Sequence, residues 1–295
     1  NKSIVAITAA MPEGCGLLEF KAGYPGRFFD VGIAEQHAVT SAAGLAAAGL
    51  IPVVCVYSSF LQRGFDQIVH DVCLQNLHVV FAIDRAGLVG ADGETHQGIF
   101  DVSFLTCIPN MTLLAPKNAK ELKSALKFAI DFDGPVAVRY PRGIAYDSLN
   151  EFESKIEFGK GEMLFEESDI ALFAIGSMVS TAKNLREKLK SRGFNVSVAN
   201  ARFFKPIDFE LVDKLCKNHK LIVTMEESVI NGSMGEKIKA YIKDRDCNTD
   251  VLNIALPDGY VEHGDVSLLR KKLEIDSDSV LKKVLDRYEK IKDEG

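Results

Sequence analysis

This chain of 295 residues lacks three features, each typical of a different class of protein: a strong positive charge, paired cysteines and a long apolar run. Its net charge of -6 gives no electrostatic reason to bind nucleic acid or an anionic membrane surface, so an anionic substrate must meet a local group of cations. Paired cysteine spacing is also absent, which argues against a disulfide framework and against a cysteine zinc site. The six cysteines are scattered as Cys15, Cys55, Cys73, Cys107, Cys216 and Cys247.

A sustained apolar run of membrane-spanning length is the third missing feature. Residues 38–61 carry no charged side chain, and their number alone would allow a span. Thr40, Ser41 and repeated glycine and alanine weaken the apolar character, and Pro52 precedes a β-branched run. We expect a buried helix followed by a buried parallel strand. No basic leader precedes the apolar residues 4–7 and there is no initial Met, so we expect a chain cut from a longer one.

Apolar runs of strand length alternate with segments of helical period in the first half. Such alternation predicts right-handed βαβ units and a mostly parallel sheet with helices on both faces. Ligands of such sheets bind at the carboxyl ends of the strands, where we expect Tyr57, Asp84, Arg85 and Arg139. Strands are predicted over residues 4–8, 52–57, 79–83, 112–114 and 135–138. Helices are predicted over residues 35–48, 60–74 and 119–132, the last capped by Asn118.

A polar, acidic stretch interrupts this alternation, and we place a linker at residues 146–162. A second α/β pattern follows. The fold class is therefore two three-layer α/β/α domains, at residues 1–145 and 163–295, each with a mostly parallel sheet. The second domain is expected to have strands at residues 170–175, 195–199, 221–225 and 251–254, and helices at 180–192, 208–218, 234–244 and 277–291. Its Glu226 and Glu227 are assigned to capping and solubility, and His263 to a structural or surface role.

Charged and polar side chains of the first half gather in four blocks. The first is Asp30-Val-Gly-Ile33-Ala-Glu35-Gln-His37, at the start of the uncharged segment. The others are Tyr57-Ser-Ser-Phe60-Leu-Gln-Arg63, Asp84-Arg85-Ala-Gly87 and Gly90-Ala-Asp92-Gly-Glu-Thr-His96-Gln-Gly98. In this order and spacing the blocks resemble the 1-deoxy-D-xylulose-5-phosphate synthase family of thiamine-diphosphate enzymes.

The resemblance implies a thiamine-pyrimidine-binding domain followed by a transketolase C-terminal-like domain. It makes Glu35 the carboxyl that bonds the distal pyrimidine nitrogen and favours the imino tautomer of the cofactor. It makes Phe60 the ring stacked on the pyrimidine and Ile33 the residue that wedges the cofactor into a bent shape. Taken without the resemblance, Glu35 is an acid stabilised at a helix N-terminus and Phe60 belongs to the core.

The resemblance also assigns the substrate side chains. Arginine suits phosphate because its planar fork gives bidentate, charge-assisted hydrogen bonds. Arg63 and Arg142 match the phosphate-holding arginines most closely, with Arg85 a third, although any single arginine can be a surface ion pair. Tyr57, Asp92 and His96 are implied around the acceptor aldehyde, where His96 would orient or protonate the developing alkoxide.

The Gly-Asp-Gly motif with a downstream Asn, which holds Mg²⁺ and the diphosphate in thiamine enzymes, is absent from the sequence. Ala91-Asp92-Gly93 has a different first residue and lacks the downstream Asn. We therefore expect no metal ligand in this chain. The family carries that site in a preceding N-terminal domain, which would complete the active site, and we predict that this chain alone is inactive.

The intact enzyme would condense pyruvate and glyceraldehyde 3-phosphate to 1-deoxy-D-xylulose 5-phosphate with loss of CO₂, for isoprenoid, thiamine and pyridoxal precursors. The missing domain would leave a large apolar surface that needs cover, so we expect a homodimer. The expected compartment is the bacterial cytoplasm, or a plastid after removal of a transit peptide. One alternative is a β-type subunit of a 2-oxoacid dehydrogenase or a split transketolase half; the other is a non-catalytic assembly module. The block from Asp92 to His96 and the Arg63/Arg142 pair favour the synthase.

Overall fold

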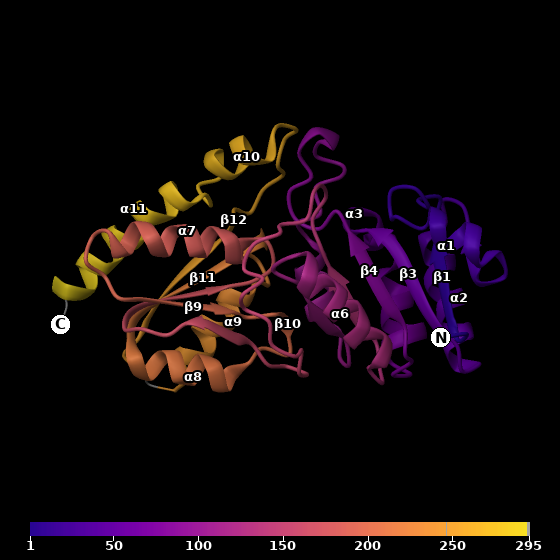
Figure 1. Cartoon of the computed structure of the whole chain (residues 1–295), viewed down its shortest axis with the longest axis horizontal. Coiled ribbons are helices and arrows are strands. Elements are labelled where there is room, and N and C mark those ends of the chain that lie inside the picture. Colours follow the sequence, from indigo (N-terminus) through magenta and orange to yellow (C-terminus); the bar gives the residue numbers. More distant parts are fainter. Residues whose placement is uncertain (246, 294–295) are drawn as a thin grey trace.

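Two mostly parallel sheets lie side by side in the computed structural model, which describes residues 1–245 and 247–293 (Figure 1). In this part of the chain the first sheet has seven strands in the order β10-β5-β6-β4-β3-β1-β2. Only the β10–β5 pair is antiparallel. The strands are β1 Ile4–Thr8, β2 Phe28–Asp30, β3 Ile51–Tyr57, β4 Val80–Asp84, β5 Thr112–Leu114, β6 Val136–Arg139 and β10 Phe203–Lys205.

The second sheet has the order β12-β11-β8-β9-β7, with β7 antiparallel to β9 and the other neighbours parallel. Its strands are β7 Glu162–Phe165, β8 Asp169–Ala174, β9 Val196–Asn200, β11 His219–Val229 and β12 Asp250–Leu256. The predicted fold class, two α/β units with mostly parallel sheets, is confirmed. β11 is longer than predicted, so Glu226 and Glu227 lie inside the strand and not after it.

The helices of the first half follow from local sequence. α2 has alanine and valine at helical spacing, which it buries against β3. α6 begins after Asn118, whose side chain accepts a hydrogen bond from the Glu121 N–H at 2.8 Å, as predicted. The α-helices are α1 Leu18–Gly23, α2 Glu35–Ala47, α3 Ser58–Leu61, α4 Phe65–Gln67, α5 Asp101–Thr106 and α6 Ala119–Asp131. Three short 3₁₀ turns are η1 Pro25–Arg27, η2 Gln62–Gly64 and η4 Gly90–Asp92.

The prediction of one α-helix over residues 60–74 was wrong. The segment is divided into α3, η2, α4 and a π-helical stretch, η3 Ile68–Cys73. Gly64 lies where a Cβ atom would come within 3.0 Å of the Val39 side chain and 3.7 Å of the Glu35 carbonyl oxygen. The close approach of this segment to α2 therefore depends on a residue without a side chain, and the regular α-helix is interrupted there.

The second half is covered by α7 Met178–Lys190, α8 Phe209–Asn218, α9 Met234–Lys243, α10 Val266–Lys272 and α11 Ser277–Asp293. Asp208, Ser233 and Asp265 cap α8, α9 and α10 with side-chain oxygens. Within residues 1–245 and 247–293, no helix has the length and apolarity that a membrane span requires.

The two halves share structure beyond their sheets. Strand β10, which comes from the second half of the sequence, pairs with β5 at the edge of the first sheet. Beside it a buried group of ions crosses between the halves: the Lys117 ammonium lies 3.1 Å from Glu121 and 2.7 Å from Glu162, and Arg202 bonds Glu121 at 2.7 Å. Because each buried charge has an opposite partner, this group fixes the halves against each other. Residues 140–161, which include most of the proposed linker, contain no helix or strand.

Candidate active site at the carboxyl edge of the first sheet

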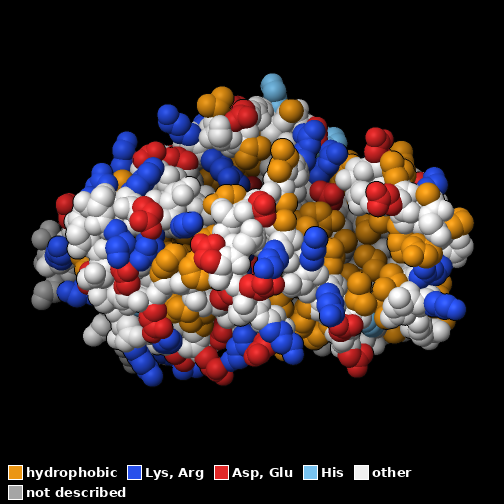
Figure 2. All heavy atoms as spheres, viewed as in Figure 1, with side chains coloured by type: hydrophobic (Ala, Val, Ile, Leu, Met, Phe, Trp, Pro, Cys, Tyr) orange, Lys and Arg blue, Asp and Glu red, His pale blue; other side chains and the backbone are white. Residues whose placement is uncertain are grey.

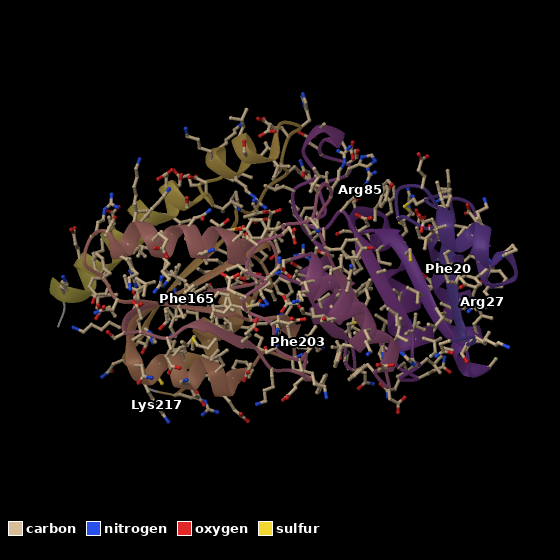
Figure 3. The ribbon with its side chains drawn as sticks, viewed as in Figure 1. Phe20, Arg27, Arg85, Phe165, Phe203 and Lys217 are labelled. Atoms are coloured by element: carbon tan, nitrogen blue, oxygen red, sulfur yellow. The ribbon has the colours of Figure 1, made fainter. Side chains whose placement is uncertain are left out.

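The ends of β3 and β4 bring the predicted site residues together. Tyr57 is the last residue of β3 and pairs in register with Asp84, the last residue of β4. α3 starts immediately after Tyr57, so Phe60 lies within its first turn. The segment of residues 85–98, here called the rim loop, follows β4 and carries Arg85, Asp92 and His96. Figure 3 labels Arg85 at this end of β4.

Aromatic contacts hold four of these residues in one group. The rings of Tyr57 and Phe60 are 5.5 Å apart, and the Phe60 and His96 rings meet edge to face at 5.1 Å. The Arg85 guanidinium lies over the Tyr57 ring at 3.9 Å. Burial raises the pKa of Tyr57, so its phenol stays a hydrogen-bond donor at neutral pH. On His96, Nδ1 lies 2.9 Å from the Thr95 hydroxyl, which orients the imidazole.

Asp92 links two of the predicted phosphate-binding arginines. Its carboxylate lies 2.6 Å from Arg85 and 3.2 Å from Arg142. Arg142 also donates to the Val89 carbonyl at 3.2 Å. A guanidinium group has five N–H donors, more than these contacts use, so both arginines retain donors for an anion. The arrangement can therefore receive a phosphate between cations that a carboxylate already orients.

Glu35 and Arg63 form a separate pair. Glu35 begins α2, and its side chain is 2% exposed. Arg63 Nη1 lies 3.3 and 3.4 Å from the two carboxylate oxygens, while the Arg63 side chain itself is 57% exposed. Ile33, two residues before Glu35, is 81% exposed. The pair thus combines a buried carboxylate with a cation that solvent reaches.

A cleft of about 570 Å³ opens between the halves beside this rim. Arg85, Arg142 and Tyr140 line it from the first half, and Glu227 and Arg270 line it from the second. Glu35, Arg63, Phe60 and His96 are not among its lining residues. Figure 2 shows basic and acidic side chains beside one another in the region where Figure 3 labels Arg85, above an exposed apolar surface of the first half.

The residues present fit the pyrimidine end of thiamine diphosphate. Glu35 supplies a buried carboxyl, the partly exposed Phe60 supplies a ring face, and Ile33 supplies an exposed apolar side chain. In the described ranges, 1–245 and 247–293, no three His, Cys, Asp or Glu side chains are grouped so that they could hold a metal ion.

Sequence reasoning missed the contacts that the second half makes with the rim. Glu227 accepts a hydrogen bond from the Leu88 N–H of the rim loop at 2.9 Å. Arg139 is the last residue of β6, at the predicted strand end, but it is 6% exposed and bonds Asp101 at 2.8 and 3.1 Å. A buried Arg opposite a buried Asp gives no signal in one sequence, because their separation of 38 residues follows only from the packed fold.

Two protein-family models match consecutive segments of the chain. "Transketolase, pyrimidine binding domain" matches residues 1–146, and "Transketolase, C-terminal domain" matches residues 159–280.

Curated relatives are similar over nearly the whole chain. A protein of Lachnoclostridium phytofermentans named 1-deoxy-D-xylulose-5-phosphate synthase is 54% identical over 285 residues, which is 96% of this chain and 46% of that protein. The protein of the same name from Caldanaerobacter subterraneus subsp. tengcongensis is 50% identical over 292 residues, 99% of this chain and 47% of that protein. The chain spans about half the length of these relatives.

Solved structures show the same architecture. A split-gene transketolase described as an inactive beta4 tetramer has a TM-score of 0.86 and 28% identity, covering 97% of this chain and 92% of its own. Transketolase from Campylobacter jejuni has a TM-score of 0.79 and 19% identity, covering 97% of this chain and 44% of its own, and it shows the fold.

Proposed function

The chain belongs to the 1-deoxy-D-xylulose-5-phosphate synthase family, and we propose that it is the pyrimidine-binding and C-terminal part of a synthase that condenses pyruvate with glyceraldehyde 3-phosphate. The products would be 1-deoxy-D-xylulose 5-phosphate and CO₂. The observation that carries the proposal is the meeting, at one edge of the first sheet, of the Arg85–Asp92–Arg142 group with Phe60 and His96.

Thiamine diphosphate, when bound, supplies the chemistry that releases CO₂ from pyruvate and carries the remaining two carbons. Glu35 would hydrogen-bond the distal nitrogen of its pyrimidine, with Phe60 packed on the ring and Ile33 against the centre of the molecule. Arg63 now occupies both carboxylate oxygens of Glu35. Because the Arg63 side chain is more than half exposed, it can turn toward solvent or substrate and leave Glu35 free for the pyrimidine.

The remaining residues would bind the acceptor. Arg142 and Arg85 would hold the phosphate of glyceraldehyde 3-phosphate, and Asp92 would keep the two guanidinium groups at a fixed separation. Arg63, which with Arg142 matches the phosphate-holding arginines of the family most closely, would join them after it turns from Glu35. Tyr57 would remain a donor beside the aldehyde. His96, oriented by Thr95, would donate a proton to the oxygen that becomes an alkoxide.

We further propose that this chain cannot turn over by itself. The Mg²⁺ and diphosphate site would lie in the N-terminal segment of a longer protein, which accords with the chain covering 46% and 47% of two relatives. We expect the complete enzyme to be a homodimer in the cytoplasm. A β-type dehydrogenase subunit, a split transketolase or a non-catalytic module is not favoured, because relatives about 50% identical carry the synthase name whereas the split transketolase is 28% identical.

The product decides between these functions. The complete protein should release CO₂ from pyruvate only at a rate matched by formation of 1-deoxy-D-xylulose 5-phosphate when glyceraldehyde 3-phosphate is added. Transfer of a two-carbon ketol unit between sugar phosphates, without CO₂, would instead identify a transketolase. Reduction of NAD⁺ together with lipoyl and coenzyme A partners would identify a dehydrogenase subunit.

A further inference from the structure

The rim loop is held by the second half of the molecule as well as by its own ends. Three hydrogen bonds reach it from there: Leu88 N–H donates to Glu227 at 2.9 Å, Gly264 N–H donates to the Gly90 carbonyl at 3.2 Å, and the Gln97 side chain donates to the Glu262 carbonyl at 3.0 Å. In Figure 1 the segment after β4 lies against the segment that precedes α10. The second half therefore forms one wall of the candidate site.

Glu227 is the charged side chain among these contacts, and both of its carboxylate oxygens accept hydrogen bonds. The residue lies inside β11 and is 3% exposed. Oε1 accepts from Leu88 N–H, while Oε2 accepts from Arg270 at 2.7 Å. Its backbone carbonyl accepts from Arg139 at 3.3 Å. One residue thus joins a strand of the second sheet, a helix of the second half and the rim loop of the first.

The base of the rim loop is closed where Glu227 touches it. Gly87 and Gly98 exchange backbone hydrogen bonds of 2.6 and 2.8 Å. Gly87 has a φ of +82°, and a Cβ atom there would lie 2.5 Å from Glu227 Oε1. The carboxylate therefore packs directly on the glycine backbone, two residues from Arg85 and five from Asp92. A carboxylate in this place fixes the start of the loop that carries both residues.

We propose that Glu227 is a positioning residue for the phosphorylated acceptor: it fixes the rim loop and so sets Arg85 and Asp92 opposite Arg142. The inference rests on the proposed function, because it assumes that this arginine group binds phosphate. It gives the second half of the chain a part in substrate recognition, through a residue that contacts the rim loop.

The test uses the complete enzyme with Glu227→Gln, which keeps the size of the side chain but places an amide where Arg270 requires a carboxylate. We expect KM for glyceraldehyde 3-phosphate to rise about tenfold, the factor that about 1.4 kcal/mol produces, while KM for pyruvate changes less than about twofold. Arg270→Ala, at a side chain that is 24% exposed, should shift the same constant in the same direction. Glu262→Gln is the matched control, since that side chain is 54% exposed and pairs with Lys272, and its contact with Gln97 is made by the backbone.

A second readout does not depend on turnover. Amide hydrogen exchange over residues 85–98 should quicken in Glu227→Gln and stay unchanged in Glu262→Gln. If the exchange is unaffected, or if KM for both substrates rises equally, Glu227 only supports the fold and the proposal is overturned. If the exchange quickens but the unsubstituted enzyme makes no product from the two substrates, the proposed function fails and the role in phosphate recognition fails with it, while the contact with the loop stands.

Discussion

The two sheets place acidic side chains near corresponding edges but leave them in different surroundings. In the first half, Asp92 is 24% exposed and Glu35 is paired with an arginine that solvent reaches. In the second half, Glu226 is fully buried and accepts hydrogen bonds from Ser228 and from the N–H groups of Met234 and Gly235 at the start of α9. Side chains at the edge of the first sheet keep hydrogen-bond donors and charge accessible to a ligand. At the edge of the second sheet, the Glu226 carboxylate is used in hydrogen bonds within the protein.

Within the second half, the direction of a carboxyl's pKa shift depends on the groups that surround it. Burial raises the pKa of Glu226, against the lowering effect of its N–H and hydroxyl donors. Burial also acts on Glu162, but hydrogen bonds from Lys117 and Ser154 and the charge of Arg202 outweigh it and lower the pKa of that carboxyl. Within the second half, therefore, a carboxylate is stable in its charged form where cations from both halves surround it.

The largest effect is expected at Glu35. In the complete enzyme, Glu35→Gln should lower kcat by about 10²- to 10⁴-fold, the range of a lost proton-transfer partner. The melting temperature should change little, because the amide fills the same space. Glu94→Gln, an exposed change in the rim loop, is the control and should leave kcat unaltered. A normal kcat in Glu35→Gln would show that Glu35 does not assist the cofactor. The edge of the first sheet would then no longer differ from that of the second by a carboxyl that takes part in catalysis.

Arg142→Ala should have the next largest effect. Loss of a charge-assisted hydrogen bond of about 1.5–3 kcal/mol corresponds to a rise of about 10- to 100-fold in KM for glyceraldehyde 3-phosphate. KM for pyruvate should stay near its original value. Lys217→Ala, at an exposed cation on α8 that Figure 3 shows far from the cleft residue Arg85, should change neither constant. Equal effects from both variants would mean that the protein attracts the substrate by overall charge and not at this site.

Two glycines of the rim loop separate backbone strain from contact with the second half. Gly87 and Gly93 have φ values of +82° and +79°, so alanine is strained at either position. At Gly93 the ψ of −167° places the backbone in a region that almost only glycine adopts. A Cβ at Gly93 would have its nearest neighbour at 3.5 Å, whereas at Gly87 it would lie 2.5 Å from Glu227. We expect Gly87→Ala to lower the free energy of unfolding, as measured by urea denaturation, by less when Glu227 is also replaced by alanine, because the close contact is then absent. The loss in Gly93→Ala should be the same with and without that second change. An equal loss for Gly87→Ala in both backgrounds would show that Glu227 moves away from the added Cβ without cost.

The dependence of melting temperature on acid pH should show the contribution of the buried ion group between the halves, which contains Glu162. The pKa of Glu162 is lowered from its ordinary 4.5, so its contribution to stability is present above that value and is lost as pH falls through the lower, folded pKa. Glu162→Gln should therefore show a shallower loss of melting temperature below about pH 4.5, together with lower stability at pH 7 because Lys117 and Arg202 lose a partner. Glu166→Gln, at a side chain 53% exposed, should follow the unsubstituted chain. Parallel acid profiles for Glu162→Gln and the unsubstituted chain would contradict this account.

Periodicity was sufficient to predict the central elements of the fold. β1 and β5 have the predicted bounds, and α2 and α6 end one residue before the predicted limits. These segments have clear apolar spacing and, for α6, a cap. β2, β7 and β10 were missed. Each has only three or four residues and includes a charged side chain, Asp30, Glu162 or Lys205, so none forms an apolar run as β5 does. That β10 would join the first sheet was also hidden, because its partner β5 lies about ninety residues earlier.

For the candidate site, too, some features could be predicted from the sequence and others could not. Its residue types were found in the sequence because they follow strand ends in a recognisable order. Their pairing was not, because contacts such as Arg63 with Glu35 or Glu227 with Leu88 depend on how separate segments pack. Asp92 was expected near the aldehyde, and the structure shows in addition that it bridges two arginines.

The most direct test of the account is turnover by the isolated 295-residue chain with pyruvate, glyceraldehyde 3-phosphate, thiamine diphosphate and Mg²⁺. We expect no formation of 1-deoxy-D-xylulose 5-phosphate from this chain alone, and formation once the N-terminal segment of the complete protein is joined to it. Robust turnover by the purified chain without that segment would contradict the central claim that this chain binds the pyrimidine and the acceptor but needs another segment for the diphosphate.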